Sequence, residues 1–152
     1  MSIIVSLKEV ADTLEMLSET TEAYLVRETG EILVVNEDDH LALEDSDDTE
    51  MPEWQREHIT RLREILNTDR VVQLPSSDDI DAWSIMEQFC YAMADAKLRD
   101  QLLDSIHGRG AFRMFRSTCE RLGLLEDWYA FRREAIETIA REWLESSDIL
   151  FK

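Results

Sequence analysis

The sequence predicts an α+β fold, in which a small antiparallel sheet (a hairpin plus a third short strand) packs with about five to six helices. Three observations predict it. Several segments repeat apolar residues every three or four positions, two β-rich runs flank a Thr-Gly pair, and the chain has 152 residues of which 44% are hydrophobic. That length is typical of one domain and that apolar share suffices for a packed core. We therefore expect one mostly helical domain over residues 1–152.

The N-terminal part predicts a helix followed by the hairpin. The helix covers residues 6–17, with Ser6 as its N-cap and Glu9 three positions later. Its apolar stripe is Leu7, Val10, Leu14 and Leu17. Two β-rich runs, residues 22–28 and 31–36, then flank Thr29-Gly30, with glycine in the left-handed turn position. Both runs are apolar on both faces, so we expect helices to cover part of each face.

Residues 36–53 predict an acidic loop. The segment contains nine carboxylates and no lysine or arginine, and such repulsion favours an extended chain. The stretch from Asp45 resembles a calcium-binding loop, but Glu50 and Arg56 stand where that motif needs glycine and a carboxylate. The segment therefore predicts no metal site.

The middle of the chain predicts three helices and the third strand. A helix opened by Pro52 reaches about Asn67, and residues 71–75 form the strand. The apolar positions of the helix opened by Pro52 are Trp54, Ile59, Leu62, Ile65 and Leu66. One further helix starts at Ser76 and a shorter one covers residues 96–106. The apolar positions of the helix from Ser76 are Trp83, Met86, Phe89, Cys90, Ala92 and Met93.

Residues 107–144 predict a helical region rich in glycine, arginine and aromatic residues. His107-Gly-Arg-Gly110 interrupts the helices, and a helix then runs from Ala111 to Leu122, before Gly123 in the usual C-terminal position. A long helix covers residues 126–144. Its apolar side consists of Trp128, Phe131, Ala135, Ile139 and Trp143.

Composition favours a soluble cytoplasmic protein. The chain carries 34 acidic against 16 basic residues, a net charge of −18. The longest apolar run, residues 89–94, is far shorter than the about 20 residues of a membrane helix, and the N-terminus does not resemble a secretory signal. The two cysteines, Cys90 and Cys119, lie in apolar stretches and are expected to be reduced and buried.

No motif points to catalysis, a metal or a cofactor. The sequence contains no nucleophile elbow, P-loop, GxGxxG or HExxH motif. His40 and His58 have no partner at metal-ligand spacing, and His107, beside glycines, is more typical of a capping or surface group than of a general base. We therefore name no catalytic, cofactor-binding or metal-binding residue.

Residues 107–133 reverse the charge of the chain. They contain six arginines and three carboxylates, a charge of +3, so that the rest carries −21. On a helical wheel Phe112, Phe115, Cys119 and Leu122 form one stripe, and Arg109, Arg113 and Arg116 lie about a quarter-turn away. The candidate ligand or partner surface consists of His107, Gly108, Arg109, Gly110, Arg113, Arg116, Trp128, Tyr129 and Arg132.

Three interpretations of this surface stay open. The arginines could pair with internal carboxylates while their stems cover apolar side chains. They could hold an anion at the start of the helix after Gly110, where backbone N–H groups are exposed. They could also dock a protein or a nucleic acid.

For the function, these residues favour a non-enzymatic binding or regulatory module that takes an unknown protein or an anionic ligand, with no membrane partner. One alternative is contact with nucleic acid through residues 107–133, which the net charge opposes overall but the local patch permits. Another is an enzyme that uses His107 with a carboxylate.

Five blocks resemble one known family. They are Thr29-Gly-Glu31, Leu74-Pro75 with Ile85–Phe89, Ile106–Phe115, Trp128-Tyr-Ala-Phe131 and Glu142-Trp-Leu-Glu145. From about residue 20 to the C-terminus they are similar, in order, to bacterial uncharacterised protein family 0158, whose pattern often has lysine where Arg109 or Arg116 stands. The resemblance implies a small cytoplasmic bacterial protein and no known activity.

Overall fold

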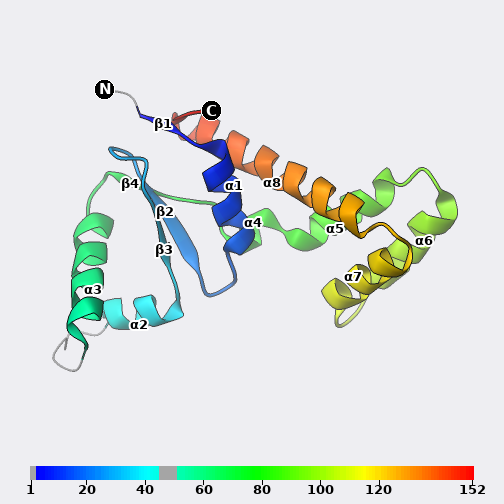
Figure 1. The fold of residues 1–152 in the computed structure, drawn as a ribbon, viewed down its shortest axis with the longest axis horizontal. Helices are drawn as coiled ribbons and strands as arrows, with labels where there is room; N and C mark the ends of the chain where they lie inside the picture. Colours follow the sequence, from blue (N-terminus) through cyan, green and yellow to red (C-terminus); the bar gives the residue numbers. More distant parts are fainter. Residues whose placement is uncertain (1–2, 45–50) are drawn as a thin grey trace. The chain divides into compact units, whose positions relative to one another are not determined.

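The computed structural model describes residues 3–44 and 51–152 and confirms the α+β class (Figure 1). The chain divides into two compact units. The first consists of Met1–Ser77 with Ala140–Lys152, and the second of Asp78–Ile139. The single domain stays a prediction.

The first unit contains the predicted three-stranded sheet. Strands β2 (Glu22–Val26), β3 (Ile32–Val35) and β4 (Val71–Gln73) are antiparallel in the order β3-β2-β4. Tyr24 stands opposite both Leu33 and Gln73. Gly30 has a φ of +74° in the β2–β3 turn. The hairpin and the third strand are thus both confirmed.

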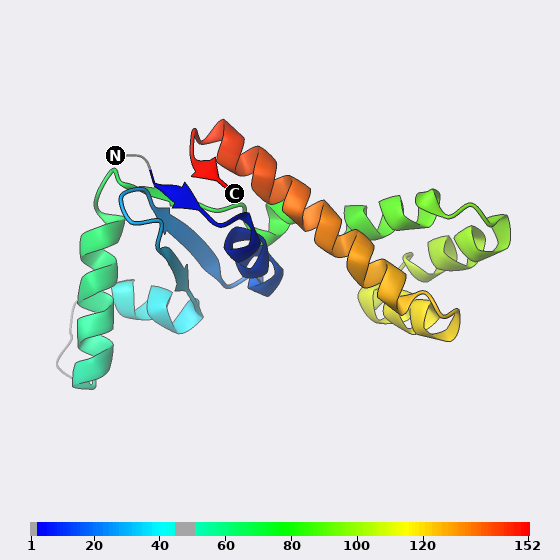
Figure 2. The same cartoon turned by 45° about the horizontal axis from the view of Figure 1, so that its top comes forward.

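Helices lie on both sides of this sheet, α1 (Leu7–Met16) on one and α3 (Glu53–Leu66) on the other (Figure 2). Successive side chains of a strand point to opposite faces, so Ala23 and Leu25 are buried on the face away from Tyr24. Tyr24 packs against a buried cluster on the α3 side. The cluster consists of Val35, Ala42, Ile59 and Leu62.

One expected core residue of α3 is exposed. Trp54 has 71% of its surface accessible, whereas Ile59 and Leu62 are at 1%. Trp54 lies five residues before Ile59, which places it on a different side of an α-helix. The inclusion of Trp54 in the apolar stripe was therefore wrong.

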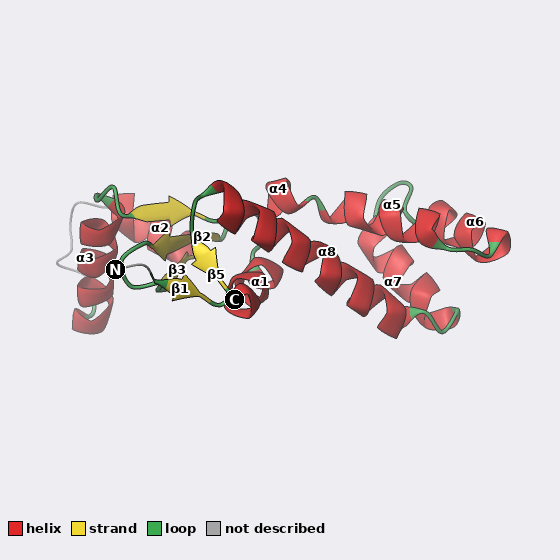
Figure 3. Ribbon diagram, turned by 90° about the horizontal axis from the view of Figure 1, so that it is seen from above, coloured by secondary structure: helices red, strands yellow, loops and turns green. Residues whose placement is uncertain are grey.

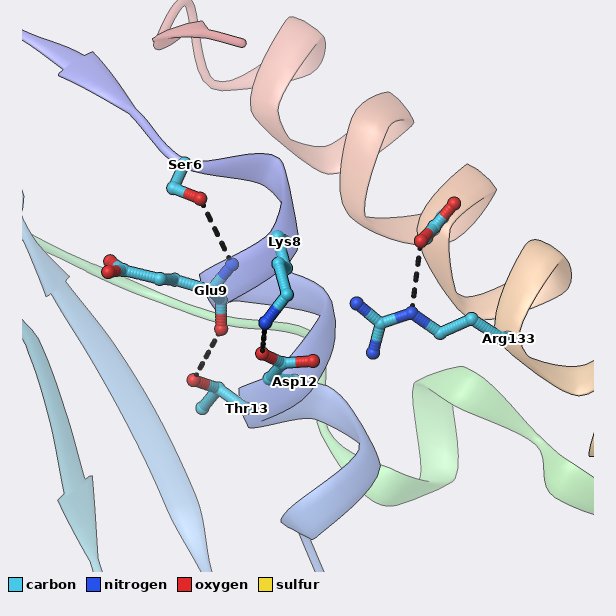
Figure 4. A network of polar contacts seen from close by, with 7 residues as sticks. Ser6, Lys8, Glu9, Asp12, Thr13 and Arg133 are labelled. Atoms are coloured by element: carbon cyan, nitrogen blue, oxygen red, sulfur yellow. Dashed lines mark hydrogen bonds and ion pairs between the residues drawn. The ribbon is translucent and has the colours of Figure 1, made fainter.

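The start of α1 follows the predicted cap (Figure 4). The Ser6 hydroxyl accepts a hydrogen bond from the Glu9 N–H at 3.3 Å. One turn on, Lys8 pairs with Asp12 at 3.1 Å, and the Thr13 hydroxyl donates to the Glu9 carbonyl at 2.8 Å. The cap satisfies an N–H group that has no partner within the helix.

The two ends of the described chain form a parallel strand pair that the sequence did not predict (Figure 3). Strand β1 (Ile4–Val5) pairs with β5 (Leu150–Phe151). The Leu7 N–H also donates to the Lys152 carbonyl at 3.1 Å. Both strands belong to the first unit, so this pair joins the N-terminal and C-terminal segments of that unit.

The acidic segment is only partly as predicted. Residues Glu37–Glu44 form helix α2 instead of a loop, and residues 45–50 of the expected loop lie outside the described residues. Asn36 and Asp39 cap α2 reciprocally: the Asp39 N–H donates to the Asn36 side chain at 2.8 Å, and the Asn36 N–H donates to the Asp39 carboxylate at 3.2 Å. This cap and the favourable position of acidic side chains at a helix N-terminus outweigh the repulsion between them.

The second unit is helical. Helix α4 (Ser77–Ile80) leads into it, followed by α5 (Ala82–Ala92), α6 (Ala96–Ser105), α7 (Ala111–Arg121) and α8 (Leu125–Ser146), whose last residues belong to the first unit. Helices α6, α7 and α8 match their predicted ranges within two residues.

The single helix expected after Ser76 is two helices. Asp81 interrupts it with a φ of +50°, and its side chain accepts the Ser84 N–H at 3.2 Å, which caps α5. An aspartate tolerates this left-handed backbone better than most residues. With α2 and α4 added, the described residues contain more helices than the five to six expected.

Four aromatic rings join three helices of the second unit. Phe89 of α5 lies 6.0 Å from Phe115 of α7, 5.5 Å from Trp128 and 5.3 Å from Phe131, between ring centroids. Trp128 and Phe131 come from α8, and Trp128 lies 4.8 Å from Phe115. All four contacts are edge-to-face, the arrangement that aromatic quadrupoles favour. This aromatic cluster is the core against which α7 packs.

Replacement of Phe115 tests that core. Phe115 is 1% exposed, so we expect Phe115→Ala to lower the free energy of unfolding by about 3 to 5 kcal/mol. The matched control is Phe112→Ala on the same helix. Phe112 is 59% exposed, and its loss should change stability by no more than about 0.5 kcal/mol. Urea unfolding followed by circular dichroism measures both, and equal losses would contradict the orientation of α7.

Candidate functional site

The predicted interruption at His107-Gly-Arg-Gly110 is the turn between α6 and α7. Gly108 and Gly110 have φ angles of +86° and +73°, which other residues adopt at a cost. A Cβ atom on either glycine would meet no atom within 4 Å. Their need for glycine is therefore conformational, and the backbone of the turn is open to approach.

Helix α7 presents two different faces. Its buried residues are Ala111, Phe115, Thr118 and Cys119. At about 100° per residue, Phe112 lies about 60° from Phe115, at the edge of this buried stripe in the first turn of the helix, and it is 59% exposed. The expectation that Phe112 belongs to the apolar stripe was wrong, because Ala111 takes the core position one turn before Phe115.

The exposed face of α7 combines cations with apolar side chains. Arg109, just before the helix, and Arg113 and Arg116 within it are exposed, as are Phe112 and Met114. We call these five residues the α7 surface. Two of its members, Phe112 and Met114, were not among the predicted site residues. The alternation of large apolar and basic residues from 112 to 116 is the sequence signal for them.

The three arginines of the α7 surface have no side-chain partner in the part of the chain that the structure describes. Within residues 3–44 and 51–152, Arg109, Arg113 and Arg116 form neither an ion pair nor a side-chain hydrogen bond. Arg61 and Arg70 of the first unit, in contrast, bind Glu31 at 2.7 Å and Glu28 at 3.0 Å. In the described part of the chain, internal ion pairing thus does not account for these three arginines.

The three α8 residues of the predicted surface have different environments. Trp128 is 8% exposed and belongs to the aromatic cluster, so its ring packs in the core. Tyr129 is 43% exposed, and Arg132 is half-buried. The neighbouring Arg133 donates to the Glu137 carboxylate at 3.0 Å. The structure connects α8 to α7 here through the ring contact of Trp128 with Phe115.

An open pocket of about 690 Å³ lies at the α6–α7 turn. It is lined by Trp83, Ile106, His107, Gly108, Gly110, Ala111, Phe112 and Arg113. Trp83 of α5 was predicted as a core position and not as a site residue. Its indole N–H donates to the Ile106 carbonyl at 2.9 Å, which fixes the ring beside the turn. We call this hollow the turn pocket; its lining contains His107 and no carboxylate.

The described residues contain no group of three or more His, Cys, Asp or Glu side chains placed to hold a metal ion. Nor does any helix within residues 3–44 and 51–152 have the length and apolar character to cross a membrane.

Fold and site together define a small acidic α+β protein with a cationic, partly apolar helix face. A family model described as an uncharacterised protein family, UPF0158, matches residues 2–152. The chain therefore belongs to this family, as the five sequence blocks indicated. No curated protein and no solved structure matches the chain.

The two cysteines lie in the core of the second unit, as predicted. Cys90 of α5 and Cys119 of α7 are 0% exposed and form no disulfide. Burial raises the pKa of each thiol to about 11, and the proximity of Cys90 contributes further to the rise at Cys119. The reactive form of cysteine is the thiolate, so neither side chain is suited to nucleophilic chemistry at neutral pH.

These raised pKa values predict slow alkylation and a loss of stability in alkali. At pH 8 we expect iodoacetamide to modify both cysteines only after unfolding. The unfolded thiols lose their protons near their ordinary pKa of about 9, whereas the folded thiols keep theirs to about 11. Their contribution to stability is complete below pH 9 and falls as the pH rises to 11. Mass spectrometry of alkylated protein and urea unfolding at several pH values measure these effects. Rapid labelling of folded protein at pH 8 would contradict the burial.

Proposed function

We propose that this protein is a non-enzymatic binding or regulatory module that recognises an anionic ligand or an acidic partner protein through the α7 surface. The observation that carries the proposal is that Arg109, Arg113 and Arg116 have no side-chain partner among the described residues of a chain whose net charge is −18. The proposal includes the bacterial cytoplasm as the location, as expected from the sequence.

The chemistry of the α7 surface supports this proposal. A guanidinium group can donate two parallel hydrogen bonds to one carboxylate or phosphate, and three such groups lie within about two helical turns. Phe112, close to Arg116 on the helical wheel, is 59% exposed, and Met114, on the far side of Arg113, is 54% exposed. Arginine, methionine and aromatic residues are enriched in protein interfaces. The surface thus offers both charge recognition and apolar contact area.

Tyr129 and Arg132 of α8 remain part of the proposed surface, whereas the buried Trp128 would act by holding α7 in place. Of the alternatives, contact with nucleic acid would use the same arginines. Long-range repulsion by the acidic chain opposes it. An enzyme that uses His107 would need a carboxylate beside it, and the turn pocket supplies none from the residues that line it.

Replacement of all three arginines tests the proposal. We expect Arg109→Gln, Arg113→Gln and Arg116→Gln together to abolish capture of the partner from a lysate of the native bacterium. Because these side chains have no partner within residues 3–44 and 51–152, the melting temperature should stay within a few degrees of the wild type. Affinity capture with mass spectrometry, with and without nuclease, gives the first result, and thermal unfolding gives the second.

The matched control neutralises three other exposed cations that have no side-chain partner among the described residues: Lys97, Arg141 and Lys152. This control makes the same change in net charge and should keep the partner. Equal capture by both variants would contradict the proposal. A large drop in melting temperature of the first variant alone would instead support internal ion pairing.

A further inference from the structure

We propose that the turn pocket binds a small anionic molecule that carries a planar aromatic ring, of the size of a mononucleotide. This inference rests on the proposed function, because Phe112 and Arg113 belong to both the pocket and the α7 surface. It goes further by naming the ligand class and by adding Trp83, which lies on α5.

The size and walls of the pocket suit such a ring. Its volume of about 690 Å³ lies within the range of small-molecule sites, about 300 to 1,000 Å³. Two aromatic side chains line it, Trp83 and Phe112. Trp83 is held by its hydrogen bond to Ile106 at 2.9 Å, so it is in place before a ligand arrives. Phe112, 59% exposed, would lose contact with water when a ring covers it, which favours binding.

The polar part of the lining suits one anionic group. Among the described residues, the Arg113 guanidinium has no ion pair or side-chain hydrogen bond, and neither has the His107 ring. Gly108 and Gly110 place no side chain over the backbone of the turn. A phosphate can therefore approach both the Arg113 side chain and the turn.

The charge of the chain favours a single nucleotide over a strand. Every further nucleotide adds a phosphate, and binding of a strand depends on several cations that neutralise successive phosphates. The pocket lining contains one arginine, and the chain around it carries a net charge of −18. Each additional phosphate would therefore meet repulsion without a matching cation in the pocket.

Isothermal titration of the full chain with the 5′-monophosphates of adenosine, guanosine, cytidine and uridine tests the inference. At least one should bind saturably at concentrations up to a few millimolar. Inorganic phosphate lacks the base, and the corresponding nucleoside lacks the phosphate. Each should bind at least about tenfold more weakly than the monophosphate, because stacking of the base and contacts to the phosphate each contribute at least about a factor of ten to the affinity.

Two variants assign the site. Phe112→Leu keeps an apolar side chain but removes the ring, and Arg113→Gln removes the charge; each should raise the dissociation constant about tenfold. The matched controls are Tyr91→Leu, at an aromatic residue of α5 that is 63% exposed, and Arg141→Gln on α8. Neither control should change the constant. All four sites are exposed, so each variant should keep the wild-type melting temperature.

The outcomes separate this inference from the proposed function. If no monophosphate binds, or if Phe112→Leu binds as well as the wild type, the turn pocket is not the site, while loss of partner capture in the triple arginine variant would still support the α7 surface. Tighter binding of a six-nucleotide single strand than of any monophosphate would overturn the inference in favour of nucleic-acid contact. If monophosphates bind but no partner is captured, the result supports the turn pocket as a ligand site and contradicts recognition of a partner protein.

Discussion

The contact on which the second unit depends is the edge-to-face packing of Phe89, Phe115, Trp128 and Phe131. These rings come from three helices, so their burial fixes how α5, α7 and α8 lie within that unit. It also fixes the rotation of α7 about its axis. Once Phe115 points into the cluster, helical geometry turns Arg113 and Arg116, about 160° and 100° away, outward. Phe112, about 60° away in the first turn, lies at the edge of the core and is 59% exposed. The exposure of the α7 surface is thus a consequence of the core.

The arginines beside the α6–α7 turn differ in their partners from those beside the β2–β3 hairpin region. In the first unit Arg61 and Arg70 pair with glutamates of the β2–β3 hairpin region, Glu31 and Glu28. Such exposed pairs contribute little to stability, yet they neutralise charge locally. In the second unit the arginines next to the α6–α7 turn have no such partner among the described residues. The chain has 34 acidic against 16 basic residues, so carboxylates are plentiful. Lys97, Arg141 and Lys152 also have no side-chain partner among the described residues, but they are spread along the chain, whereas Arg109, Arg113 and Arg116 follow one another closely.

Features set by local sequence could be predicted, and features set by distant contacts could not. The Ser6 cap, the Thr29-Gly30 hairpin and the glycine turn before α7 depend on residues close together in the chain. The β1–β5 pair joins two-residue strands from opposite ends of the chain, too short for any periodic pattern. Phe112, expected on the apolar stripe of its helix, is exposed, and Trp128, expected on the recognition surface, is buried. A helical wheel gives the angular spacing of side chains but does not show which side of the helix meets the core. Trp83 was expected among the apolar positions of its helix for the same reason. Its place in the turn pocket depends on the hydrogen bond that its indole N–H donates to the carbonyl of Ile106, the residue after α6.

The same acidity that opposes a polyanion sharpens recognition at short range. Charges separated by more than about 8 Å are largely screened at physiological ionic strength, so the charges nearest to the α6–α7 turn, those of Arg109 and Arg113 among them, act most strongly on a ligand there. A long polyanion extends beyond that distance and meets the carboxylates of the rest of the chain. A compact anion, or a short acidic segment of a partner, does not. The local charge reversal within a chain of net charge −18 therefore selects for compact anions, and Phe112 and Trp83 add the requirement for a flat apolar group.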